Sequence, residues 1–125
     1  MKKLLFIILT ILSTSVYAEW DMVLRNSNGS VYYVDFDRIK KHDGFIYYWW
    51  LTDLLKPDKD GDLSYKSYNQ ADCSIFRFKQ LSGSYHKTQM GVGRGQVFKF
   101  PDEWHYPAPG SYNEAILNEV CLRSK

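Results

Sequence analysis

The sequence predicts an α+β fold: an antiparallel, meandering β-sheet with one C-terminal helix packed on it, joined by one disulfide. Three observations lead to this prediction. Short segments rich in aromatic and β-branched residues, separated by turn residues, occupy most of the chain. A helix start signal follows the last proline-rich corner. The chain also has two cysteines, Cys73 among the strands and Cys121 within the predicted helix.

The first eighteen residues have the pattern of an export signal. Lys2–Lys3 give a positive start, Leu4–Leu12 an apolar core and Val16–Ala18 a small-residue cleavage site. The apolar core is shorter than the roughly 20 residues that a membrane span needs. We therefore expect a signal peptide over 1–18 and a single mature domain over 19–125.

The expected mature chain has no net charge. The sequence has 16 Lys and Arg and 14 Asp and Glu, and the signal peptide contains two of the basic residues, Lys2 and Lys3. A general attraction to nucleic acid or to an anionic membrane is therefore not expected. No Cys follows the cleavage site to accept a lipid anchor. We expect an exported protein, periplasmic or secreted, and the sequence gives no support for surface display.

The first strands should form a hairpin. Trp20–Arg25 and Val31–Phe36 are strand candidates, and the Asn-Gly dipeptide in 26–30 favours a tight turn between them. Asp37–Lys41 is polar and fits a single helical turn. A reversal at His42–Gly44 then leads into the next strand.

Phe45–Leu55 is the most hydrophobic segment of the mature chain, and both of its alternation phases are apolar. This pattern predicts a central strand that is covered on both faces. Lys56–Leu63 reads as a charged turn. Ser64–Gln70 follows as a strand whose two tyrosines fall on opposite phases, so no buried face can be assigned.

Ala71–Leu81 is predicted as the next strand, with Phe76 and Phe78 on one face. Cys73 shares its phase with Ile75, so either the helix packs on the Ile75 face or a bulge resets the register. The sequence leaves both alternatives open.

The remaining strands are short. Ser82–Ser84 is expected to be a turn and Tyr85–Met90 a strand, and the glycines of 91–95 mark a bend. Gln96–Phe100 is the last strand candidate, and Pro101 ends it.

A helix is predicted from about Tyr112 to Leu122. Ser111 and Glu114 have the spacing of a capping box, in which each side chain satisfies a backbone N–H of the other residue. The apolar side chains fall on two rows spaced by four residues, so one side of the helix is apolar and carries a thiol. These rows are Tyr112, Ile116, Val120 and Leu117, Cys121.

The two cysteines are expected to form a disulfide. An exported protein meets oxidising conditions, and Cys73 is the one partner that the chain offers Cys121. The bond would close a loop of about 48 residues, for which chain entropy suggests roughly 4 kcal/mol of stabilisation. The alternative is a pair of free buried thiols.

Two loops resemble ligand sites. Asp58, Asp60 and Asp62 alternate as in the opening of a calcium loop, but the later bidentate Glu is missing, and an Asp-Gly hairpin turn explains the pattern without a metal. The glycines of 91–95 lack the full spacing of a phosphate-binding loop, and no helix follows them. No metal and no cofactor is expected.

Catalytic signals are also weak. His42, His86 and His105 are dispersed, and none has a His or Cys partner at short spacing. No serine lies in a nucleophile motif, and a bridged cysteine cannot act as a nucleophile. We do not expect an enzyme.

One surface has the composition of a protein interface. Tyrosines alternate with Lys and Arg across three neighbouring segments, and Tyr and Arg dominate protein interfaces. The alternative is a solvated sheet face with Lys stems lying over apolar surface. The possible partner-binding residues are Tyr65, Lys66, Tyr68, Arg77, Lys79, Tyr85 and Lys87.

The chain resembles the surface-adhesin protein E family of Gram-negative bacteria. The resemblance covers nearly all of 19–125 and rests on the order of its motifs and its two-cysteine frame. The motif residues are Trp20, Val31–Asp35, Ile39, Trp50–Asp53, Ser64–Tyr65, Asp72–Cys73, Met90–Gly91, Trp104–Ser111 and Cys121.

The resemblance implies a small α+β domain tied by the disulfide. It also implies a non-enzymatic binding module, since the best-known members are outer-membrane lipoproteins that bind host extracellular-matrix or plasma proteins. The chain departs from them in having no lipid-acceptor Cys after the signal. The alternative function is a structural or accessory protein of the periplasmic envelope.

Overall fold

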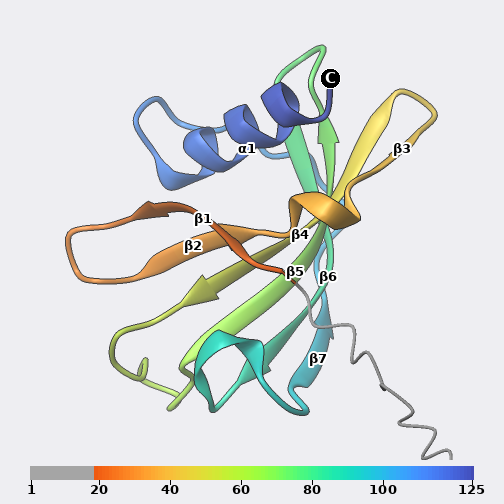
Figure 1. Cartoon of the computed structure of the whole chain (residues 1–125). Coiled ribbons are helices and arrows are strands. Elements are labelled where there is room, and N and C mark those ends of the chain that lie inside the picture. The colour runs from red at the N-terminus through yellow and green to blue at the C-terminus, as the bar shows by residue number, and fades with distance from the viewer. Residues whose placement is uncertain (1–18) are drawn as a thin grey trace, which may run out of the picture.

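The computed structural model describes residues 19–125, and the predicted signal peptide lies outside them. Six antiparallel strands follow one another across the sheet in the order β1-β2-β4-β5-β6-β7, and β3 pairs with β4 beside β2. Figure 1 shows this sheet with α1 lying across part of it. The strands are β1 Asp21–Arg25, β2 Val31–Val34, β3 Lys40–His42, β4 Phe45–Asp53, β5 Ser64–Asp72, β6 Arg77–His86 and β7 Gln96–Lys99. The antiparallel sheet with one C-terminal helix is confirmed.

The first half of the sheet follows the predicted order except at β3: Lys40 and Lys41, predicted within a helical turn, lie in a short strand that pairs with β4. β1 and β2 form the expected hairpin, and Gly29 takes the positive φ of 87° that the tight turn requires. A 3-10 turn, η1 Phe36–Arg38, replaces the predicted helical turn one residue early. β4 is central, because β2 and β3 flank one of its edges and β5 the other.

The helix α1, Tyr112–Arg123, packs on one face of the sheet. The Ser111 side chain accepts a hydrogen bond from the Glu114 N–H at 3.2 Å, as predicted. The return bond differs, because the Glu114 carboxylate accepts from the Gly110 N–H instead of the Ser111 N–H. The helix buries Ile116, Leu117 and Val120 against a shared core. The sheet residues of that core are Tyr32, Val34, Tyr48, Trp50, Ala71 and Phe78.

The strand predicted over Ala71–Leu81 is wrong, because the chain turns at 73–76. The Asp72 carboxylate accepts hydrogen bonds from the N–H and the hydroxyl of Ser74, which favours a local turn over a continuing strand. Phe76 then takes a φ of 60°. Because of this turn, Cys73 does not belong to the alternation pattern of β6. Neither alternative for Cys73 therefore holds: there is no bulge within one continuous strand over 71–81, and the helix does not pack on Ile75, which is 56% exposed.

The turn predicted at Ser82–Ser84 is also wrong, because β6 runs through it to His86. A Cβ on Gly83 would lie 2.7 Å from the Lys66 carbonyl oxygen and 2.7 Å from the Phe98 ring. The glycine therefore marks a close approach inside the sheet. The strand predicted over Tyr85–Met90 is replaced by the end of β6 and a second 3-10 turn, η2 Gln89–Gly91.

The disulfide between Cys73 and Cys121 is present, with the two Cα atoms 5.7 Å apart. It links the turn after β5 to the last turns of α1, and so fixes the C-terminal end of the helix to the sheet. At the other end of α1, the Tyr112 ring stacks on Tyr32 with 4.6 Å between ring centroids. The helix is thus held at both ends.

We predict that Cys121→Ser lowers the free energy of unfolding by up to roughly 4 kcal/mol, because the unfolded chain regains the entropy of a 48-residue loop. Urea unfolding without reductant measures this change. A Cys73→Ser/Cys121→Ser double variant should have the same midpoint as the single variant. A midpoint equal to that of the parent protein would contradict the prediction.

Candidate functional site

The seven predicted interface residues lie on both faces of the sheet. Direct pairing places Tyr65 opposite Tyr85 on the face that carries α1. Lys66 and Tyr68 point to the other face, which we call the helix-free face. Arg77 and Lys79 also point there. Lys87 follows the end of β6 and lies against the loop before β5. The structure therefore brings four of the seven together on one face and separates the other three from them.

A row of aromatic side chains runs along the helix-free face. The Tyr68 ring lies 5.0 Å from Trp49 and 6.1 Å from Tyr47, measured between centroids. All three residues are half-buried. The sequence predicts Tyr47 and Trp49 only as part of a central strand, and their shared alternation phase is the signal that groups them on this face.

Trp104 extends this row at the end near the disulfide. Its ring lies 5.8 Å from Phe45. The Arg77 guanidinium and the Lys79 ammonium lie 4.1 and 4.6 Å from the Trp104 ring centroid. Both cations also form ion pairs, Arg77 with Asp72 and Lys79 with Asp102. The helix-free face therefore presents aromatic rings beside cations whose charges are partly neutralised.

The helix face carries a groove beyond the N-terminal end of α1, which we call the aromatic groove. It has a volume of about 700 Å³ and is bounded by the sheet, the first turn of α1 and the segment 100–111. Tyr65 and Tyr85 lie in it, with their rings at right angles and 5.3 Å apart. The groove has the size and the mixed lining of small-molecule sites.

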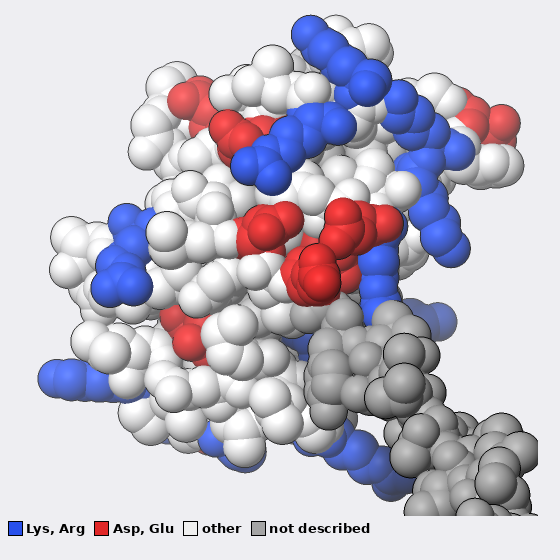
Figure 2. Space-filling view, in the orientation of Figure 1, with Lys and Arg blue, Asp and Glu red and all other residues white. Residues whose placement is uncertain are grey.

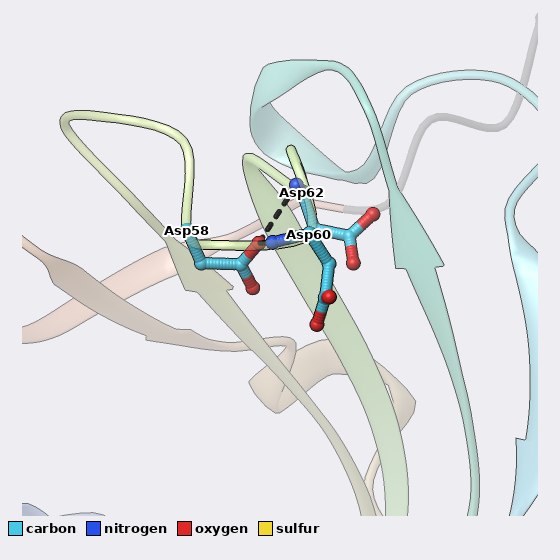
Figure 3. Close-up of side chains that lie close together, drawn as sticks. All are labelled: Asp58, Asp60 and Asp62. Carbon is cyan, nitrogen blue, oxygen red and sulfur yellow. Dashed lines mark hydrogen bonds between the residues drawn. The ribbon is translucent and has the colours of Figure 1, made fainter.

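The acidic loop is held together by its own contacts. Figure 3 shows Asp58, Asp60 and Asp62 in one loop, with the Asp58 carboxylate turned toward the loop backbone. That carboxylate accepts hydrogen bonds from the N–H groups of Asp60 and Asp62 and from the Tyr65 hydroxyl. These bonds lower the pKa of Asp58, the Tyr65 bond most.

Lys87 supplies a cation to the same loop. Its ammonium pairs with the Asp62 carboxylate at 3.0 Å and donates to the Asp60 carbonyl. Two of the three carboxylates thus already have donors from the protein. Among residues 19–125, this is the only group of three or more His, Cys, Asp or Glu close enough to share a metal ion. The contacts are those of a closed hairpin turn, the alternative that the sequence offered.

The glycine-rich segment 91–95 makes a bend between η2 and β7. Gly91 and Gly93 have φ values of 62° and 76°, and the Gly91 N–H donates to the Ser64 hydroxyl. Its first glycine lies against the stem of Lys66, 2.8 Å from the place of an added Cβ. The glycines serve backbone geometry here.

The three histidines lie on separate elements. His42 is exposed at the end of β3 beside Asp43, and His105 forms an isolated bridge with Phe78. His86 is 2% exposed, and its Nε2 lies 2.7 Å from the Ser84 hydroxyl. Burial, and then the nearby Lys66 ammonium, lower the pKa of His86 below its ordinary value of 6.5.

Charge on the surface is mixed. In the view of Figure 2, basic side chains gather over the C-terminal end of α1 and over β3, while acidic side chains lie beside them over η1. Arg123 at that end of the helix lies over the Phe36 ring and pairs with Glu119. On the face seen in this view, neither sign of charge forms a broad field.

Because the folded state holds His86 neutral, acid should destabilise the protein. Above pH 6.5 both states are neutral at this residue. Below it the unfolded chain takes up the proton first, and stability falls by up to about 1.4 kcal/mol per pH unit until the folded pKa is reached. Urea unfolding between about pH 7 and 5 measures the slope. His86→Gln should reduce this slope, whereas the exposed-site variant His42→Gln should keep it; equal slopes in both variants would contradict the assignment.

None of the helices among residues 19–125 is long and apolar enough to cross a membrane. No curated protein sequence is significantly similar to the chain. Crystal structures of protein E from Haemophilus influenzae share its fold, among them the following two. Protein E from non-typeable Haemophilus influenzae is 14% identical in sequence with a TM-score of 0.57. The structural match covers 87% of this chain and 79% of that chain. Crystal form II of H. influenzae protein E is 16% identical in sequence with a TM-score of 0.62. The structural match covers 90% of this chain and 94% of that chain.

The family model of surface-adhesin protein E matches residues 20–122, which is most of the chain. The match spans every strand and all but the last residue of α1. The expected resemblance is therefore confirmed, and the chain belongs to the surface-adhesin protein E family.

Proposed function

We propose that this protein is an exported, non-enzymatic binding module of the adhesin type, which contacts a host extracellular-matrix or plasma protein through its helix-free face. The family is one of surface adhesins. The observation that carries the proposal is the row of half-buried aromatic rings beside Lys and Arg on one face of the sheet. Aromatic residues and Arg are enriched in protein interfaces, where they bury much area at low entropic cost.

Tyr68 is the centre of the proposed surface. Its ring packs between Tyr47 and Trp49, so its conformation is fixed before a partner arrives. Lys66 lies next to it along β5, and Arg77 and Lys79 lie toward the disulfide end. A partner with apolar surface rimmed by acidic groups would complement this arrangement.

A second candidate function is a structural or accessory role in the periplasmic envelope. One observation favours it: the side chains of Arg77 and Lys79 are only 22% and 18% exposed, and both are already paired with carboxylates. Cations that are already paired have less charge available to attract a partner.

For the adhesin proposal we predict that Tyr68→Ala weakens binding to a host protein by about tenfold or more, because it removes the ring at the centre of the surface. The measurement is surface plasmon resonance on a panel of immobilised vitronectin, laminin and plasminogen. Lys59→Glu, in the exposed loop before β5, is the control and should bind as the parent does.

The charged part of the surface has its own test. A Lys66→Glu/Lys79→Glu variant should bind more weakly, mainly through a slower association rate at low salt. Thermal unfolding checks that each variant remains folded, because Lys79 also pairs with Asp102. No saturable binding of the parent protein to the panel, or binding unchanged in the variants, would refute the adhesin proposal.

Cell fractionation separates the two functions. An adhesin should be cleaved by protease added to intact cells, because a host partner must be able to reach it. Release by osmotic shock, together with protection from external protease, is the result expected for the periplasmic role and would exclude contact with a host protein on intact cells.

A further inference from the structure

The aromatic groove lies on the opposite face of the sheet from the proposed protein-binding surface. Aromatic rings line it from two sides. Toward the helix, Trp50 meets the Tyr112 ring edge to face, with 5.9 Å between centroids. Toward β7, Tyr85 and Phe98 are stacked with 4.2 Å between centroids. Tyr85 remains 37% exposed, so ring surface is open to the groove.

The backbone is built to hold this second pair of rings. Phe98 lies directly over Gly83, where an added Cβ would be 2.7 Å from the ring. A residue with a side chain at position 83 would push Phe98 away from the sheet and away from Tyr85. The absence of a side chain at that position lets the Phe98 ring lie close to the floor of the groove.

Uncharged polar groups alternate with the rings. The groove is also lined by hydroxyl and amide side chains, and one of them has an unsatisfied atom: the Asn113 amide oxygen is buried without a hydrogen-bond partner among residues 19–125. The Trp50 indole N–H donates to the Thr52 hydroxyl at 2.7 Å, which fixes the ring. Besides the tyrosines and His105, the uncharged polar lining residues are Thr52, Ser67, Gln80, Ser111 and Asn113.

Fixed charge is nearly absent from the lining. Within the described part of the chain no Asp, Glu or Arg lines the groove, and Lys66 is the one residue with a permanent charge. The Lys66 side chain lies on the helix-free face, because Lys66 pairs with Ser84, and its stem packs against Gly91. Only the Lys66 carbonyl oxygen lies beside Gly83 on the groove side. An anionic or cationic ligand would lose its hydration here without gaining a counter-charge.

We infer that the aromatic groove binds an uncharged saccharide. The apolar C–H face of a sugar ring packs on aromatic rings, and its hydroxyl groups need partners of the kind that the amides and hydroxyls provide. A purely aliphatic ligand would leave those polar groups unpaired, which costs free energy. The inference is independent of the proposed protein binding, because the two surfaces lie on opposite faces of the sheet.

The test is a titration of the purified protein with three neutral probes: lactose, cellobiose and triacetylchitotriose. Isothermal calorimetry and saturation-transfer NMR follow the binding. We expect at least one probe to bind with a Kd of about 1 mM or tighter. Sialyllactose, which adds a carboxylate to lactose, should bind more weakly than lactose. No saturable binding of any neutral probe up to about 10 mM would overturn the inference.

Variants locate the binding. Tyr85→Ala should weaken saccharide binding about tenfold or more by removing an exposed ring from the groove. Val97→Ser is the matched control. Val97 in β7 is 77% exposed and pairs with Ser84, so its side chain lies on the helix-free face. This variant should bind saccharide as the parent does. Asn113→Ala at the start of α1 is the second groove variant, used if Tyr85→Ala unfolds.

The remaining outcomes decide where the saccharide binds and whether the groove binds a peptide instead. Binding unchanged in folded Tyr85→Ala and Asn113→Ala would place the saccharide elsewhere and overturn the inference. Saturable binding of an uncharged aromatic tripeptide, without binding of the saccharides, would identify a peptide groove instead. Loss of saccharide binding in Tyr85→Ala with host-protein binding retained would separate this site from the helix-free face.

Discussion

The packing of one short helix on a seven-stranded sheet is the constraint on which the rest of the structure depends. The twelve residues of α1 are about 18 Å long, whereas the nine-residue strands β4 and β5, which it contacts, reach about 30 Å. The helix can therefore cover only part of one face. The Cys73–Cys121 disulfide and the Tyr32–Tyr112 stack fix which part, since they hold its two ends. The aromatic groove is the portion of this face that α1 leaves uncovered.

Among residues 19–125 no α-helix covers the helix-free face, and the 3-10 turn η2 and the Trp104 side chain shield its two ends. Leu51 points to this face and is completely buried, because η2 lies against β4 and β5 there. Farther along, Trp104 covers the end near the disulfide and is held by Arg77 and Lys79. The aromatic row between these two covers keeps partial exposure. A sheet with one helix thus offers two different surfaces, which can act without interfering with each other.

Electrostatics in this protein is local. Lys87 and the backbone of the acidic loop satisfy the Asp58 and Asp62 carboxylates, and Arg77 satisfies Asp72. The expected mature chain has equal numbers of acidic and basic residues, so its net charge gives no general attraction to a partner. Any electrostatic steering on the helix-free face comes from local cations such as Lys66 and Lys79, and the contact itself depends on rings and directed hydrogen bonds, which is why Tyr68 and Tyr85 are the informative positions to change.

The sequence alone determined the first hairpin, the central strand, the helix with its Ser111 cap, and the cysteine pair, because these depend on local propensity and on a chain with only two thiols. It also held the signal that Tyr65 and Tyr68 lie on opposite faces, since an odd spacing within one strand reverses the side chain. Only the tertiary structure decided the faces of the residues after β5. Arg77 and Tyr85 have an even spacing, yet the register shift between β5 and β6 places them on opposite sides. A one-residue bulge reverses every later side chain, and long-range pairing sets its position.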